Sequence, residues 1–320
     1  MGGNEKKSGN KKEKNDQEYI MTGLNVSVYL AEDIYSVESR ETITNFVNTN
    51  IDEIRNCFDC FVLEKMPNHI GRKQDAQMMA NQAHSAELEK LTKITGREFI
   101  EKNKETMIGN PKTFYINDEY YDYHDLFIIY FYHSLVSFLS EKRDKEIFFV
   151  CEIGGGYGGL IHRIKKNFPG AVCLLFDLPE QNYISNYYLK RLNPKAKVLN
   201  LKGLMSMKKT KSLDSIKIEK DDLKKFDYVI LPGYLIEKIH NSFIDVFINT
   251  RSFMEMNLET IYFYFSEIHR LVCDDGLFYC VNRYRKERRA AMRNAKLRLS
   301  NLNIKELTQV MKGKSKHIKH

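Results

Sequence analysis

The chain has 320 residues, of which 42% are hydrophobic and 12% aromatic, and its formal net charge is +8. A chain of this length and composition can fold around a full hydrophobic core. Classes of protein that are too short or too polar to form such a core are therefore excluded. The length fits one catalytic domain of common size with an added helical region.

The positive charge is concentrated at the two ends of the chain. Residues 283–320 hold 13 Lys and Arg against two acids, a sum of +11, and residues 1–16 contribute +2. Subtracting both from +8 leaves −5 for the remainder. A mildly acidic body argues against an enzyme with a nucleic-acid-binding active face, so no nucleic-acid partner is expected. The basic tail predicts a solvated helix, with contact to an anionic surface as the alternative.

Membrane and metal signals are weak. The longest apolar stretch, residues 127–139, contains His133 and is too short to span a bilayer. No signal peptide is recognised at the start, so a reducing cytoplasm is the expected location. Cys57 and Cys60 have a suggestive spacing, but no second pair and no histidine at finger spacing accompany them. We therefore predict no metal site.

The first 140 residues are predicted to form a helical region after a disordered start. Residues 1–17 are mainly Lys, Asn, Gly and Glu with almost nothing to bury, and are expected to be disordered. Residues 18–140 show mostly helical spacing and are predicted to form an N-terminal cap that covers the later domain. At the start of a long aromatic helix, Tyr123, His124 and Asp125 are expected either to line a substrate pocket or to be polar tips of a core helix.

Residues 146–159, EIFFVCEIGGGYGG, are the most informative stretch of the chain. The apolar run lacks polar alternation, as expected for a parallel strand buried on both faces. The glycines that follow it can turn the main chain sharply and let a ligand approach closely. Apolar residues at helical spacing come next, which places the turn at a helix N-terminus where amides point outward. This order predicts a nucleotide-type cofactor site, although glycine runs also occur in ordinary loops.

Two acidic residues narrow the class of cofactor. Glu152 lies two residues before the first glycine, and the next apolar run, residues 171–176, ends in Asp177. An acid at the end of the second strand can accept hydrogen bonds from both ribose hydroxyls of an adenosine. The pattern therefore favours an adenosine cofactor.

The remaining elements alternate strand and helix, so the predicted fold class is α/β. A helix over 180–192 precedes two apolar runs, 197–201 and 226–231, either of which fits the third strand; the polar stretch 202–225 between them is predicted as a loop. A clear strand over 243–248, a helix over 258–272 and a fifth strand over 277–282 follow.

Five blocks of residues resemble the sugar O-methyltransferase family, within the class I S-adenosylmethionine-dependent methyltransferases. They are EIGGGYGG at 152–159, DLPE at 177–180, YYL at 187–189, INTRSFMEM at 248–256 and VNRY at 281–284. The resemblance covers roughly residues 105–285. It implies a Rossmann-like sheet flanked by helices in a domain over 141–284, S-adenosylmethionine as cofactor, and a saccharide hydroxyl as methyl acceptor. The tail over 285–320 departs from it, because a complete domain of this class adds an antiparallel strand pair.

The resemblance and the motif together assign the site. Glu255 is the predicted general base, because it lies in the segment after the strand where the resemblance implies a base, and His240, His124 and Asp125 are held in reserve. The predicted cofactor-binding residues are Glu152, Gly154, Gly155, Gly156, Tyr157, Gly158, Asp177, Leu178, Leu231, Asn249 and Thr250. The predicted substrate-binding residues are Arg251, Ser252, Tyr123, His124 and Asp125. The alternatives are an NAD(P)-dependent oxidoreductase and a non-catalytic adenosine-binding protein.

Overall fold

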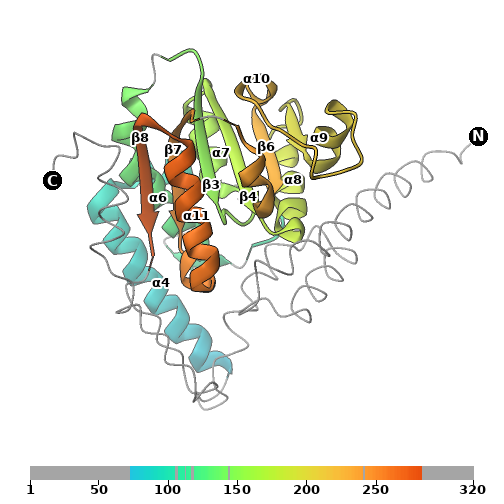
Figure 1. The fold of residues 1–320 in the computed structure, drawn as a ribbon. Helices are drawn as coiled ribbons and strands as arrows, with labels where there is room; N and C mark the ends of the chain where they lie inside the picture. The colour runs from blue at the N-terminus through green and yellow to red at the C-terminus, as the bar shows by residue number, and fades with distance from the viewer. Residues whose placement is uncertain are drawn as a thin grey trace, which may run out of the picture.

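The computed structural model describes residues 73–282, except 105–106, 112, 117–118, 143–144 and 241. Within them, a six-stranded parallel sheet carries helices on both faces and follows a smaller N-terminal unit (Figure 1). The predicted disordered start, the first part of the predicted cap, the Cys57–Cys60 pair and the basic tail lie outside the described residues.

The sheet has the order β5-β6-β4-β3-β7-β8, with every adjacent pair parallel. Its strands are β3 (Phe148–Ile153), β4 (Ala171–Asp177), β5 (Val198–Asn200), β6 (Tyr228–Pro232), β7 (Ile244–Thr250) and β8 (Val272–Val281). Apart from the three-residue edge strand β5, the order is third, second, first, fourth, fifth along the chain. This is the doubly wound, Rossmann-like arrangement, and the predicted α/β class is confirmed.

Side chains of each central strand alternate between two hydrophobic cores. In β3, Val150 faces the first core and Cys151 the second. The first core is covered by α6 (Tyr123–Glu141), α7 (Gly159–Asn167) and α8 (Pro179–Leu192). The second is covered by α9 (Leu201–Met207), α10 (Lys220–Leu223), the 3-10 helix η3 (Gly233–Lys238) and α11 (Leu258–Leu271), which crosses the front of the sheet in Figure 1. Burial on both faces explains why β3 and β4 are continuous apolar runs.

The N-terminal unit has its own small core. It consists of α4 (Lys73–Thr95), α5 (Arg97–Asn103) and an antiparallel hairpin of β1 (Thr113–Ile116) and β2 (Glu119–Asp122). Leu88, Ile100, Phe114 and Tyr121 pack there against the start of α6. The unit therefore joins the rest of the molecule mainly through α6, whose long aromatic helix was predicted from the sequence.

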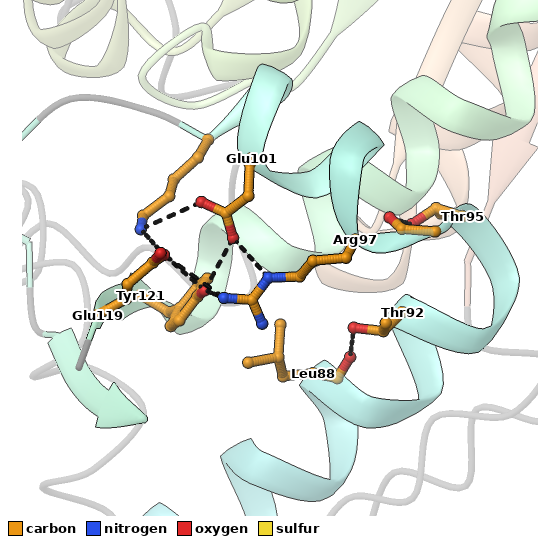
Figure 2. A network of polar contacts seen from close by, with 9 residues as sticks. Leu88, Thr92, Thr95, Arg97, Glu101, Glu119 and Tyr121 are labelled. Carbon is orange, nitrogen blue, oxygen red and sulfur yellow. Dashed lines mark hydrogen bonds and ion pairs between the residues drawn. The ribbon is translucent and has the colours of Figure 1, made fainter. Parts of the chain in front are cut away.

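A polar network fastens the hairpin to α5 (Figure 2). The Tyr121 hydroxyl oxygen lies 2.8 Å from Glu119 Oε2 and 2.9 Å from Glu101 Oε1, and it also accepts a hydrogen bond from Arg97. Lys104 Nζ lies 2.8 Å from the same Glu119 oxygen. Two cations and two carboxylates thus surround one buried tyrosine, which fixes the hairpin directly before α6.

Three sequence predictions are revised by the observed elements. Both apolar runs left open as the third strand are strands, but β6 pairs with β4 while β5 pairs only with β6 among the described strands. The stretch predicted as a loop over 202–225 contains most of α9 and all of α10. The hairpin β1–β2 was not predicted, because its strands have four residues each and give almost no periodic signal.

Candidate functional site at the carboxyl edge of the sheet

The chain reverses its direction of progress across the sheet between β3 and β7. From β3 it proceeds through β4 to β6, then returns to β7 on the other side of β3. Open α/β sheets bind ligands in the crevice outside the carboxyl ends of the strands at such a switch point. Gly154 follows β3 at this place, and Arg251 and Ser252 follow β7. The topology thus brings the predicted cofactor and acceptor segments together.

The glycine turn depends on backbone angles that favour glycine. Gly154, Gly156 and Gly158 have φ values of 71°, 58° and 88°, in the left-handed region. Gly158 is the N-cap of α7, so the turn leads directly into a helix N-terminus. A Cβ atom on Gly156 would meet nothing within 4 Å, whereas one on Gly154 would lie 2.3 Å from Ser252 Oγ. Gly154 is therefore required by packing, and the space beside Gly156 is open.

Asp177 connects the end of β4 to the glycine turn. Its Oδ2 accepts a hydrogen bond from the Gly156 amide at 2.8 Å, and its Oδ1 accepts one from the Leu178 amide at 2.7 Å. The side chain is half-buried. A carboxylate has about four lone-pair positions and can accept several hydrogen bonds at once. The predicted ribose acceptor thus also helps to shape the turn.

Glu152 lies beneath the same turn and is almost fully buried. Its Oε2 is buried and has no hydrogen-bond partner among the described residues. Burial, and then the neighbouring Asp177 carboxylate, raise the pKa of Glu152 to about 8, against the opposing effect of a hydrogen bond with the Ile161 backbone. Gly155 is needed beside it, because a Cβ there would lie 2.6 Å from that Oε2 atom. Burial therefore favours the neutral, protonated form of this carboxyl group.

The segment after β7 closes over the end of β3. Asn249 Nδ2 donates to the Ile153 carbonyl oxygen at 3.0 Å, and Ser252 Oγ donates to the same oxygen at 3.1 Å. Asn282, after β8, donates to Asn249 Oδ1 at 2.8 Å. Three strand ends are tied together by this network. Asn249 is fully buried within it, so its predicted contact with a cofactor is revised to support of the strand ends.

Arg251 and Glu255 lie in the segment that follows β7, next to the glycine turn. Arg251 has φ 66°, uncommon for a residue with a side chain, and its guanidinium lies 4.8 Å from the centre of the Phe127 ring on α6. Glu255 ends the 3-10 helix η4 (Phe253–Glu255), and its amide donates to the Ser252 carbonyl at 2.9 Å. Glu255 thus stands three residues from the side chain that packs on Gly154.

The remaining predicted cofactor residues divide by burial. Tyr157 lies inside the first core, and its ring meets the ring of Tyr188 at 4.8 Å between centroids. Leu231 is fully buried in the second core. Their side chains support the edge and do not line it, whereas Leu178 and Thr250 are half-buried at the strand ends.

Two of the predicted substrate and catalytic residues do not present their side chains to the edge. Asp125 is 3% exposed and forms a buried ion pair with Arg163 of α7, so its carboxylate is engaged within the protein. His240 follows η3, which carries the chain back to the amino end of β7. From Ile244 to Thr250, β7 advances six residue steps, about 20 Å. His240 therefore lies toward the other edge of the sheet from Thr250, and we give it no role in the reaction.

The start of α6 lies close to the site. Asp122 caps the helix by accepting from the His124 amide at 2.9 Å. His124 is half-buried, and the side chain of Tyr123 lies outside the described residues. The predicted roles of these two residues therefore stay predictions.

Sequence reasoning missed two residues that help to build the edge. Asn282 lies in the last block of the resemblance, but its bonds to Asn249 and to the Met254 amide depend on the pairing of β7 with β8. The hydroxyl oxygen of Tyr264 on α11 lies 2.2 Å from the position that a Cβ atom on Gly233 would occupy, so no larger residue fits there. Burial raises the pKa of Tyr264 above its usual range, so it stays neutral. Spacing in the sequence gave no signal for either contact.

The described part of the chain contains neither a membrane-spanning helix nor a cluster of metal-binding side chains. Its helices include none that is both long and apolar enough to cross a membrane. Among its side chains, no group of three or more His, Cys, Asp or Glu is arranged to hold a metal ion.

Comparisons with known proteins give similarities among solved structures alone. No family model matches the chain. No curated protein matches it either. A coclaurine N-methyltransferase bound to N-methylheliamine and SAH is 11% identical over 75% of this chain, with a TM-score of 0.31; the match spans 62% of that protein. The mitomycin 7-O-methyltransferase MmcR is 14% identical over 91% of this chain and 81% of its own, with a TM-score of 0.30.

Proposed function

We propose that this chain is an S-adenosylmethionine-dependent O-methyltransferase that transfers a methyl group to a saccharide hydroxyl. The observation that carries the proposal is that described residues from all five blocks of the family resemblance contact one another around the glycine turn and the adjoining strand ends. They are up to about 130 residues apart in the sequence. Fold alone does not imply a function, so the support comes from the contacts between these blocks.

The contacts between the blocks are specific. Ser252 of the fourth block packs on Gly154 of the first, and Asp177 of the second accepts from Gly156. Leu189 of the third block lies 3.2 Å from the position of a Cβ on Gly158. Asn282 of the fifth block donates to Asn249 of the fourth. Residues that build one site are expected to converge in this way.

The residues at the edge fit an adenosine cofactor. The open space beside the left-handed Gly156 admits a ligand close to the backbone. The Asp177 carboxylate lies at the same turn, and a carboxylate there can accept hydrogen bonds from ribose hydroxyls. Glu152 adds a buried carboxyl oxygen without a partner among the described residues, beneath a turn that would hold a cationic ligand.

The protein has a limited chemical task in this reaction. When bound, the cofactor supplies an electrophilic methyl group on a sulfonium. The chain must hold the acceptor hydroxyl in line at roughly 3 Å and take its proton. We assign the proton to the Glu255 carboxylate, and acceptor binding to Arg251, whose guanidinium is positioned over Phe127. The saccharide class of acceptor is supported by the family resemblance.

A binding experiment tests the cofactor before any acceptor is known. Isothermal titration of the full chain with S-adenosylmethionine, S-adenosylhomocysteine and NAD separates the methyltransferase from the oxidoreductase alternative. We expect binding of the first two and not of NAD. Binding of NAD alone would replace the proposal, and no binding of any of them would favour a non-catalytic protein.

A matched pair of variants links binding to the site. Asp177→Asn should weaken S-adenosylmethionine binding about tenfold or more, the equivalent of one lost charge-assisted hydrogen bond. Asp227→Asn is the control, because Asp227 also accepts from a main-chain amide, that of Lys197 at 2.7 Å, but lies before β6 at the opposite edge. Equal affinities for the two variants would contradict the ribose assignment.

A transfer experiment tests the acceptor. Purified protein with methyl-labelled S-adenosylmethionine and glycan fractions should give label in saccharide methyl ethers, identified by mass spectrometry after acid hydrolysis. Glu255→Gln should lower kcat strongly while cofactor affinity stays near that of the parent chain. Transfer to protein or amine acceptors in place of saccharides would keep the cofactor and reject the acceptor class.

A further inference from the structure

We infer that Arg163 and Asp125 are a positioning pair that makes the N-terminal unit part of the cofactor site. This inference rests on the proposed function only for the identity of the ligand, because the contacts themselves belong to the protein. Both side chains are buried, so neither is presented to a ligand in this structure. They act through the start of α7 and the start of α6.

Arg163 joins three elements with one buried guanidinium. Nε donates to the Asn103 carbonyl oxygen at the end of α5 at 2.9 Å, and Nη1 donates to the Gly159 carbonyl oxygen at the start of α7 at 3.0 Å. Nη2 pairs with Asp125 in the first turn of α6. Arg163 is 1% exposed and Asp125 is 3% exposed. A charge at this depth is stable only with such partners, so the three elements are fixed together.

The position of the pair relates it to the glycine turn. Gly159 directly follows Gly158, the left-handed N-cap of α7. The guanidinium therefore anchors the first helical residue after the turn, four residues from its own Cα. If the anchor is lost, the turn keeps its covalent path but loses the contact that fixes where the helix begins. The amides of the turn would then be spread over more orientations, which weakens any ligand bound to them.

A second contact extends the pair to the acceptor side. Phe127 lies two residues after Asp125, and the Arg251 guanidinium lies 4.8 Å from the centre of the Phe127 ring. The first turns of α6 thus touch α7 on one side and the segment after β7 on the other. Fixing Asp125 therefore sets the position of both halves of the candidate site, and the hairpin β1–β2, which ends at the cap of α6, is held in the same arrangement.

The experiment compares three variants of the full chain with a control. Asp125→Asn removes the negative charge, Arg163→Lys keeps the positive charge but loses the fork of donors, and the double variant Asp125→Asn with Arg163→Met removes both charges. The control is Asp245→Asn. Asp245 is 5% exposed, pairs with Lys145 at 2.5 Å and accepts from the Phe149 amide at 2.9 Å, all at the amino edge of the sheet.

Two readouts separate positioning from general stability. In the unliganded protein, hydrogen exchange of peptides covering 154–162 should accelerate in the three variants and stay unchanged in the control. Titration with S-adenosylhomocysteine should show about tenfold weaker binding in the variants, within the usual range of coupling energies. The double variant should recover thermal stability relative to Asp125→Asn, because no lone charge remains buried, without recovering affinity.

The contrary results are equally defined. Unchanged exchange of 154–162 in all variants that fold, with faster exchange confined to α5 and α6, would reduce the pair to a support of the N-terminal unit. Recovery of affinity in the double variant would show that stability was the cause. If the parent chain binds neither S-adenosylmethionine nor S-adenosylhomocysteine, the proposed function fails, while the exchange comparison still decides the positioning role.

Discussion

At the scale of single residues, the glycine turn separates two reasons for having glycine. Gly154 is packed against Ser252, and Gly156 faces open space with a left-handed backbone. Gly156→Ala should therefore cost only about 1–2 kcal/mol of stability from backbone strain. Its added methyl group would stand in the space proposed for the ligand, so affinity for S-adenosylmethionine should fall strongly. Thermal unfolding and titration of the same sample measure both effects.

The control for this variant is Gly96→Ala. Gly96 has φ 81° and nothing within 4 Å of its Cβ position, but it caps α5 in the N-terminal unit. Its ψ of 150° places it in a region essentially confined to glycine, so Gly96→Ala should lose at least as much stability and keep full affinity. A Gly156→Ala protein that binds as well as the Gly96→Ala protein would mean that the ligand does not approach this part of the turn.

A second prediction concerns the buried Glu152 carboxyl. Its pKa is raised to about 8 when folded, from an ordinary value near 4.5, so the folded state holds a proton that the unfolded state releases. The free energy of unfolding should therefore fall as pH rises from about 4.5 to about 8, since the unfolded state binds fewer protons there. Urea unfolding at pH 5 and pH 8 should show this loss in the parent chain. Glu152→Gln should flatten it, and an equal slope in both proteins would contradict the burial of an ionisable group.

At the scale of elements, the hairpin depends on the polar network around Tyr121 (Figure 2). Tyr121→Phe removes the hydroxyl that Arg97, Glu101 and Glu119 share, which should cost about 1–3 kcal/mol because the bonds involve charged groups. Hydrogen exchange in 97–104 and 113–122 should accelerate, with little change in the sheet. Tyr115→Phe is the matched control, since that side chain is 52% exposed. Equal exchange in the two proteins would show that packing alone holds the hairpin.

Elements with strong patterns were predictable from the sequence, and weakly patterned ones were not. The strand before the glycines, the strand over 171–176, the long aromatic helix and the helix over 258–272 were predicted close to the observed elements, because burial on two faces or a long amphipathic stripe leaves a clear signal. The two strands of the hairpin, α9 and α10 have seven residues or fewer each and were missed. Their conformation is set by tertiary contacts that no local window contains.

The candidate site was predictable as residue types and not as contacts. Glycines and Asp177 lie at the sheet edge as the motif indicated. Asp125 is an example. Its place in a polar and aromatic group suggested contact with substrate, but its carboxylate pairs with the guanidinium of Arg163, 38 residues later in the chain. Which partner a charged side chain meets depends on how α6 crosses α7, and spacing does not reveal that.

At the scale of the whole molecule, charge is distributed unevenly. Residues 283–320 carry a net charge of +11 and the whole chain carries +8, so residues 1–282 carry −3. Positive charge concentrated on a short segment favours association with polyanions, and salt weakens that association. We therefore expect the full chain to sediment with vesicles containing anionic lipid at low ionic strength, and to be released as salt is raised.

The chain ending at residue 282 should not sediment, because its net charge has the sign of the vesicle surface. It retains every described element, so its cofactor affinity and unfolding temperature serve as checks that the sheet is intact. Vesicles of neutral lipid control for apolar adsorption, and heparin in solution tests whether a polyanionic glycan competes. If the shortened chain still sediments with anionic vesicles, the binding surface lies in the acidic body and the charge argument fails; if heparin displaces the full chain at low concentration, the tail fits an anionic saccharide as well as a lipid surface.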